Sequence, residues 1–247
     1  MSDLFLNSTQ YERLWDGVLV TLQVLGIAFV LGVTLSVVFG VGRLSERVAV
    51  RAASLVYVEV ARGISSIVLL FWMAFALPIL LDFDQPSLLL MGSVALGLNM
   101  GGYGAEIVRG AIQSVPHGQT EASIALNLTT TQRIRSIILP QAMPVILPPM
   151  GNLTIEILKG TALVSLIGLS DLAGEVSKLR INRTISEDPV SIPVLLLNAL
   201  IIYFVLAQIV NLLFRFAERR VNARFERRSG RRAADVAGDA ELAGASG

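Results

Sequence analysis

The chain has 247 residues, of which 53% are hydrophobic and only 16% are charged, and its mean hydropathy is +0.67. A soluble domain carries about 25% charged residues, so lipid is the natural solvent for much of this chain. The net charge of +1 excludes a broadly basic nucleic-acid-binding protein. With no cysteine and a single histidine, the chain offers no thiolate or histidine cluster for a metal or a nucleophile. We therefore expect no metal, no cofactor and no enzyme activity.

Five apolar runs dominate the sequence, and each approaches the roughly 20 residues that a membrane helix needs. They are residues 17–42, 64–81, 88–107, 144–169 and 190–214. The first run follows no basic segment and is too long for a secretory signal, so we interpret it as a retained helix. The sequence thus predicts an all-α membrane protein with five transmembrane helices within residues 17–214. Residues 1–16 form an external segment, and residues 215–247 form a basic tail.

The arginines predict the orientation in the membrane. The connections after the first and third runs are rich in arginine, whereas residues 82–87 contain two aspartates and no basic residue. The connection after the fourth run mixes both signs, and the tail carries eight arginines. This pattern predicts an external N-terminus and a cytoplasmic C-terminus. Residues 215–232 are expected to extend the last helix along anionic lipid headgroups, and residues 233–247, rich in alanine, glycine and acid, are expected to be disordered.

The connection at residues 110–139 is unusually long and predicts two short helices. Pro116 suits the first turn of a helix, and Asn127 suits the left-handed position after a helix end. Thr129 to Gln132 match a capping box, and Pro140 begins the return to the membrane. Periodicity alone leaves two alternatives equally favoured: a docking element for a cytoplasmic partner, or an amphipathic stretch on the bilayer.

Several separated motifs resemble one family. Residues 121–128 (EASIALNL), continuing through residues 137–142 (IILPQA), resemble the EAA loop of the permeases of ABC importers, with Ser123 in place of alanine and Asn127 in place of glycine. Four other segments resemble permeases of the polar amino acid (His/Glu/Gln/Arg/opine) family: residues 57–63, 106–110, 147–152 and 158–168. Four short segments together resemble the ectoine and hydroxyectoine permeases of that group: residues 62–65 (RGIS), 70–72 (LFW), 104–106 (GAE) and 125–127 (ALN).

The resemblance implies a MetI-like permease of the cell membrane that works by alternating access. It implies cytoplasmic ATPase subunits, a second permease subunit of the same or another chain, and an extracellular solute-binding protein. Glu121, Ala122, Asn127 and Pro140 would then couple the permease to the ATPase. The chain contains no GxxxxGK[ST] phosphate-binding loop, so ATP hydrolysis requires another subunit. The rival hypothesis is a secondary carrier or channel without an ATPase, which leaves the long connection unexplained.

Three acid–base pairs stand three residues apart, close enough to share a helix face: Glu59/Arg62, Glu106/Arg109 and Glu156/Lys159. One interpretation is that these charges line or gate the translocation path; the other is that each pair neutralises itself. We favour neutralisation for the first two pairs, because they lie at the cytoplasmic edges of their spans. For the third pair, which lies inside an apolar run, the two interpretations are equally favoured. The glycine-rich segment 97–104 is interpreted as close helix packing rather than a hinge.

Overall fold

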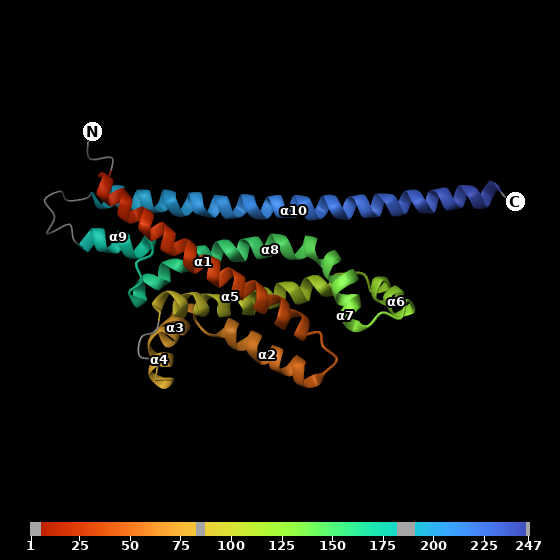
Figure 1. Cartoon of the computed structure of the whole chain (residues 1–247), viewed down its shortest axis with the longest axis horizontal. Helices are drawn as coiled ribbons and strands as arrows, with labels where there is room; N and C mark the ends of the chain where they lie inside the picture. The colour runs from red at the N-terminus through yellow and green to blue at the C-terminus, as the bar shows by residue number, and fades with distance from the viewer. Residues whose placement is uncertain (1–5, 83–86, 182–190, 246–247) are drawn as a thin grey trace. The chain divides into compact units, whose positions relative to one another are not determined.

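The computed structural model describes residues 6–82, 87–181 and 191–245, with side chains as far as Ala223 (Figure 1). Over these residues it contains helices and no strand, which confirms the all-α prediction. The chain forms two compact units. One comprises residues 1–110 and 150–211, and the other comprises residues 111–149 and 212–247. Predictions for residues 1–5, 83–86, 182–190 and 246–247 lie outside the described residues.

Ten α-helices follow one another in the described residues. In chain order they are α1 (Ser8–Gly42), α2 (Val48–Gly63), α3 (Ser66–Phe71), α4 (Leu77–Leu80), α5 (Leu88–Gln113), α6 (His117–Ala125), α7 (Thr130–Arg133), α8 (Leu139–Gly160), α9 (Leu172–Ile181) and α10 (Ile192–Ala245). Wider π-helical turns at Trp72–Ala76 and Ile134–Ile138 join α3 to α4 and α7 to α8. A tighter 3₁₀ helix, Thr161–Ile167, follows α8.

The described helices supply four or five candidate membrane spans. Four are long and apolar by themselves: Ser8–Gly42, Leu88–Gln113, Thr130–Ile167 and Ile192–Ala223. The fifth exists if α2 and the segment Ser66–Leu80 count as one span broken by a bend of 102°. The sequence predicted the second half of this pair as residues 64–81 but treated α2 as a loop, because charged residues interrupt its hydrophobicity.

Two chain ends differ from the sequence prediction. Helix α1 begins at Ser8 rather than Gly17, because Asn7 and Gln10 form a capping box in which each side chain bonds the other residue's backbone N–H, at 2.9 and 3.1 Å. Residues 8–16 are therefore helical and extend the first span beyond its predicted start. Helix α10 continues to Ala245, through residues that we expected to be disordered. Alanine favours helix strongly, and residues 233–245 are rich in alanine, so that propensity outweighs the two glycines of this segment.

Glycines let α5 approach α1 closely. A Cβ atom at Gly97 would lie 2.9 Å from the Leu31 side chain, and one at Gly101 would lie 2.7 Å from that of Leu35. On the facing helix, a Cβ at Gly32 would lie 2.7 Å from Met100. At contacts under 3.0 Å the facing helix would have to shift to admit a side chain, so the structure supports the packing interpretation of residues 97–104.

Side chains of α5 also donate hydrogen bonds to the last backbone carbonyls of α2. The last carbonyls of a helix lack an internal partner, and in lipid each unmet group is costly. Asn99 of α5 donates its side-chain N–H to the carbonyl of Ala61 at 3.0 Å, and the Tyr103 hydroxyl donates to the carbonyl of Arg62 at 3.4 Å. The bend between α2 and α3 is therefore supported by polar side chains from a neighbouring span.

The short helix α9 is fixed to α10 by a buried carboxylate and to α1 by a threonine hydroxyl. Asp171 accepts hydrogen bonds from the backbone N–H groups of Ala173 and Gly174, at 3.2 and 3.0 Å, and from the Tyr203 hydroxyl of α10 at 3.4 Å. The Thr21 hydroxyl of α1 accepts from the N–H of Leu172 at 3.1 Å. Burial raises the pKa of Asp171 to about 6, although the backbone hydrogen bonds oppose this shift.

Candidate coupling loop and membrane charges

The end of α6 is closed by a backbone motif that fixes the direction of the chain. The N–H of Leu128 bonds the carbonyl of Ser123 at 3.1 Å, and the N–H of Asn127 bonds the carbonyl of Ile124 at 2.8 Å. These are the two bonds of a Schellman motif. Asn127 has φ +56°, so the predicted left-handed conformation is confirmed. Asparagine tolerates this conformation better than most residues, which explains how it replaces the glycine of the family pattern.

The next helix starts immediately with the predicted capping box. The Thr129 hydroxyl accepts the N–H of Gln132 at 3.4 Å, and the Gln132 side chain accepts the N–H of Thr129 at 3.0 Å. Across the loop, the Gln141 amide at the start of α8 donates to the Gln119 side chain of α6 at 3.0 Å. Pro116 is the residue before α6 rather than within its first turn. The loop is thus a short helical unit closed at its turn and at its base.

The outer face of this unit combines a carboxylate with apolar side chains. Glu121 and Ala122 are exposed, as is Pro140 in the first turn of α8. Ile124 and Leu126 are 57% and 71% exposed. Glu121 makes no hydrogen bond or ion pair within the described part of the chain, so its carboxylate does not brace the loop. Ser123, the other departure from the family pattern, is buried and donates to the carbonyl of Thr120 at 2.6 Å.

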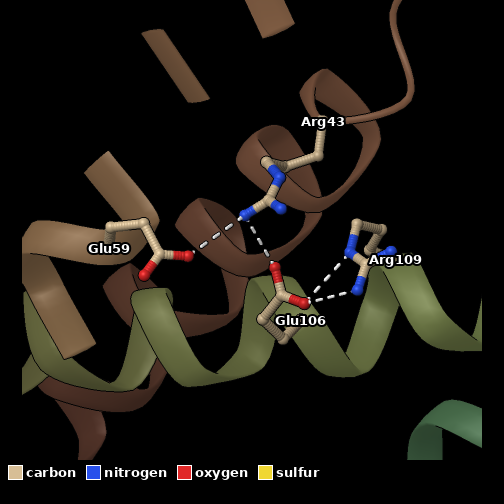
Figure 2. A network of polar contacts seen from close by, with 4 residues as sticks. All are labelled: Arg43, Glu59, Glu106 and Arg109. Atoms are coloured by element: carbon tan, nitrogen blue, oxygen red, sulfur yellow. Dashed lines mark hydrogen bonds and ion pairs between the residues drawn. The ribbon is translucent and has the colours of Figure 1, made fainter. Parts of the chain in front are cut away.

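A charged cluster joins three spans in the other unit (Figure 2). Glu106 of α5 receives two N–H groups of Arg109, at 3.0 and 2.7 Å. Its other oxygen lies 2.9 Å from Nη1 of Arg43, the residue that ends α1. Both of these facing atoms are buried without hydrogen-bond alignment, so their attraction is mainly coulombic. Glu59 of α2 lies 3.8 Å from the same Arg43 atom and is 62% exposed, which makes this contact weak.

Of the two acid–base pairs predicted at the cytoplasmic edges, the structure contains one. Glu106 and Arg109 bond each other, whereas Glu59 approaches Arg43 and, among the described residues, forms no ion pair with Arg62. Arg62 instead lies over the Tyr103 ring, 5.6 Å from its centroid. Sequence reasoning missed Arg43, which was counted only as a basic loop residue. Its position directly after α1 was visible, but spacing within one helix says nothing about partners on two others.

Glu156 and Lys159 do not neutralise each other. Both side chains are exposed, and within the described residues neither forms an ion pair or a hydrogen bond. The opposite face of α8 is buried through Leu153, Ile157 and Leu158. The interpretation that this third pair is self-neutralised therefore finds no support, and α8 presents two separate charges on the face that points out of the subunit.

These features define a class of protein. The described residues combine membrane-length helices with a locally hydrogen-bonded helical loop that carries an exposed carboxylate. This combination is consistent with the membrane subunit of a transporter. Residues 28–223 match the family described as the binding-protein-dependent transport system inner membrane component. The chain belongs to this family of MetI-like ABC importer permeases, and it is therefore an integral membrane transport component.

Individual relatives agree with this assignment. The chain is 41% identical over 209 residues to the "Probable amino-acid ABC transporter permease protein y4tF" of Sinorhizobium fredii, covering 83% of this chain and 85% of that one. It is 31% identical over 209 residues to the "L-cystine transport system permease protein TcyB" of Bacillus subtilis, with the same coverage. Its fold matches a crystal structure of an amino acid ABC transporter with histidines, with TM-score 0.72, 30% identity, and coverage of 85% and 94% of the two chains.

Proposed function

We propose that this chain is a permease subunit that imports polar amino acids, or compatible solutes that resemble amino acids, at the expense of ATP hydrolysed by a separate subunit. The names of the relatives support an amino-acid solute, since they include permeases for L-cystine and arginine as well as amino-acid permeases in general. The proposed assembly contains two permease subunits, cytoplasmic ATPase subunits and an extracellular solute-binding protein. The proposed orientation has the N-terminus outside and the C-terminus in the cytoplasm.

The observation that carries the proposal is the exposed Glu121 on a locally closed helical unit. A unit closed at its turn by the Asn127 motif and at its base by Gln119 and Gln141 can transmit force as one body. Glu121 offers a carboxylate to a cationic group, and Ile124 and Leu126 offer apolar surface for burial. Together with Ala122 and Pro140, these residues form the proposed contact with the ATPase. A loop that only rested on lipid would not need the carboxylate.

The proposed path for the solute runs along the exposed polar face of α8. Charges within a span are costly in lipid and usually face protein or water. Glu156 and Lys159 supply both signs, as a zwitterionic solute requires. The cluster of Arg43, Glu106 and Arg109 holds the ends of α1 and α5 together, with Glu59 at its margin, and Arg62 lies near the break between α2 and α3. We propose that this arrangement moves as one body when the path opens and closes.

Ectoine or hydroxyectoine is the narrower proposal for the solute. It rests on the sequence resemblance at residues 62–65, 70–72, 104–106 and 125–127. Binding of each candidate solute to the cognate solute-binding protein, followed by thermal melting, tests it directly. Stabilisation by ectoine but not by arginine, glutamate or cystine is expected, and the opposite pattern would replace ectoine by that amino acid.

The coupling role is tested by Glu121→Ala. The exchange leaves the spans untouched, so the permease should still insert. We expect uptake and solute-stimulated ATP hydrolysis by the complex to fall at least about tenfold, as when a charged interface contact worth 1.4 kcal/mol or more is lost. Glu46→Ala is the matched control, because Glu46 is also exposed but lies outside the loop. Normal uptake with a normal amount of co-purified ATPase in the Glu121 variant would refute the coupling role.

A further inference from the structure

The outward face of α10 changes from apolar to basic where the apolar run of this span ends. The exposed apolar side chains at this place are Leu212, Leu213 and Phe216. The exposed basic side chains are Arg215, Arg219 and Arg220, called the arginine cluster below. On an α-helix these three basic positions cover an arc of about 140°, and Phe216 lies within that arc. The cluster is therefore one basic surface that adjoins an apolar one.

The arginine cluster lies at the height of lipid headgroups. Helix α10 begins at Ile192, and at 1.5 Å per residue Arg215 stands about 35 Å farther along the helix. The hydrocarbon layer is about 30 Å thick, and headgroups add about 5–8 Å on each side. Arg220 stands one turn beyond Phe216, but its guanidinium reaches back to that ring, 4.3 Å from the centroid. A span that enters the hydrocarbon layer at Ile192 therefore places the cluster among headgroup phosphates.

The arginine cluster has no anionic partner within the described residues. None of its side chains forms an ion pair or a hydrogen bond there. Glu218 is the only acidic residue of positions 212–223, and its half-buried carboxylate is likewise unpaired among the described residues. Guanidinium groups form paired hydrogen bonds with phosphate oxygens. The cluster thus matches an anionic headgroup, and the adjoining apolar side chains match acyl chains.

We propose that the arginine cluster binds the headgroup phosphate of an anionic phospholipid, whose acyl chains lie along Leu212 and Leu213. In the proposed orientation this lipid belongs to the cytoplasmic leaflet. The proposal narrows the headgroup contact expected for residues 215–232 to one site, and it does not depend on which solute is transported. A zwitterionic lipid offers the same phosphate but adds a cation that the arginines repel, so the site favours anionic lipid.

Lipid binding to the full-length chain in detergent tests this proposal. The probes are dioleoylphosphatidylglycerol, which is anionic, and dioleoylphosphatidylcholine, which is zwitterionic, and native mass spectrometry measures their apparent dissociation constants. One arginine near an anionic surface contributes a factor of about five in affinity. We therefore expect the unchanged chain to bind the anionic lipid at least about tenfold more tightly. Replacing all three arginines of the cluster by glutamine should abolish this preference, and each single replacement should reduce it about two- to fivefold.

Two controls separate the charge, the place and the acyl chains. Arg13→Gln removes an equally exposed arginine near the other end of the membrane, beside Glu12 and Asp16, and should leave the lipid preference unchanged. Replacing the cluster by three lysines keeps the charge and should preserve most of the preference. Inorganic phosphate at ten times the lipid concentration should not displace phosphatidylglycerol, because it has no acyl chains. Displacement by phosphate would show a general anion site and overturn the lipid assignment.

The remaining outcomes also overturn the proposal. Equal binding of the two lipids by the unchanged chain would do so without any variant, which matters because the arginines also help to orient the chain in the membrane. An unchanged preference in the triple glutamine variant would place the lipid elsewhere. Loss of a co-purified protein with the lipid preference intact would make this face a protein interface. None of these measurements uses uptake, so the Glu121→Ala experiment tests the proposed function separately.

Discussion

The candidate coupling loop, residues 110–139, and the packed helices of the other unit, called the core below, both satisfy their backbone polar groups. They do so over different distances along the chain. In the loop, the bonds that close the turn join residues three to five positions apart, such as Leu128 with Ser123. In the core, Leu172 bonds Thr21 across 151 positions, and Asn99 bonds Ala61 across 38. The loop is therefore a local structure that a short sequence can encode. The core depends on spans that meet only after the chain has folded.

The largest difference in stability is expected when a glycine is replaced by alanine once in the core and once in the loop. A Cβ at Gly17 would lie 2.9 Å from Cα of Leu172 and 3.0 Å from its nitrogen, and such backbone atoms cannot rotate away. We expect Gly17→Ala to cost up to about 3 kcal/mol of stability because α1 and α9 must separate. Gly118 of α6 has no neighbour within 4 Å, and Gly118→Ala should be neutral or stabilise by up to about 1 kcal/mol.

Thermal unfolding of each glycine variant in nanodiscs, compared with the unchanged chain, measures these stability differences. A Gly17→Ala protein as stable as the unchanged chain would show that α9 is not held against α1. A strongly destabilised Gly118→Ala protein would show that the loop depends on contacts beyond its own residues.

Within the charged cluster of the core, we expect a smaller difference in stability between two substitutions. Glu106→Gln removes the negative charge between Arg43 and Arg109 and leaves two cations in a largely buried place. We expect a loss of about 2 kcal/mol, below the full cost of breaking a buried pair because both arginines retain some access to water. Glu59→Gln should cost less than about 0.5 kcal/mol, since Glu59 is mostly exposed. Equal losses of unfolding free energy in denaturant would contradict this ranking.

The smallest expected effect concerns the turn of the loop. Asn127→Gly should be tolerated, because glycine adopts a positive φ without strain. Asn127→Val should cost about 1–2 kcal/mol in local stability, because a β-branched residue resists that conformation. Amide hydrogen exchange of residues 117–138 reports this local opening, and exchange in α5 should not change. Equal protection in the glycine and valine variants would show that the turn does not control the loop.

The sequence predicted the loop in more detail than the core, because the contacts of the loop are local and those of the core are not. Asn127 and the Thr129–Gln132 box follow local rules, and the structure confirms both. The spans were found from hydrophobicity, but α2 was missed because Arg51, Glu59 and Arg62 interrupt it. Of the candidate charges, only Glu106 and Arg109 bond each other as their spacing suggested. Arg43 could not be found in this way, because its partners stand on two other helices that no local pattern connects to it.

The bend between α2 and α3 has a consequence for the order in which the chain enters the membrane. Helix α2 has 16 residues and is about 24 Å long, shorter than the hydrocarbon layer of about 30 Å. Its last carbonyls are bonded by Asn99 and Tyr103, which the ribosome adds some 40 residues later. Until those side chains arrive, the end of α2 needs water or the insertion machinery to satisfy it. We expect the second span to reach its final position only together with the third, as a pair rather than one helix at a time.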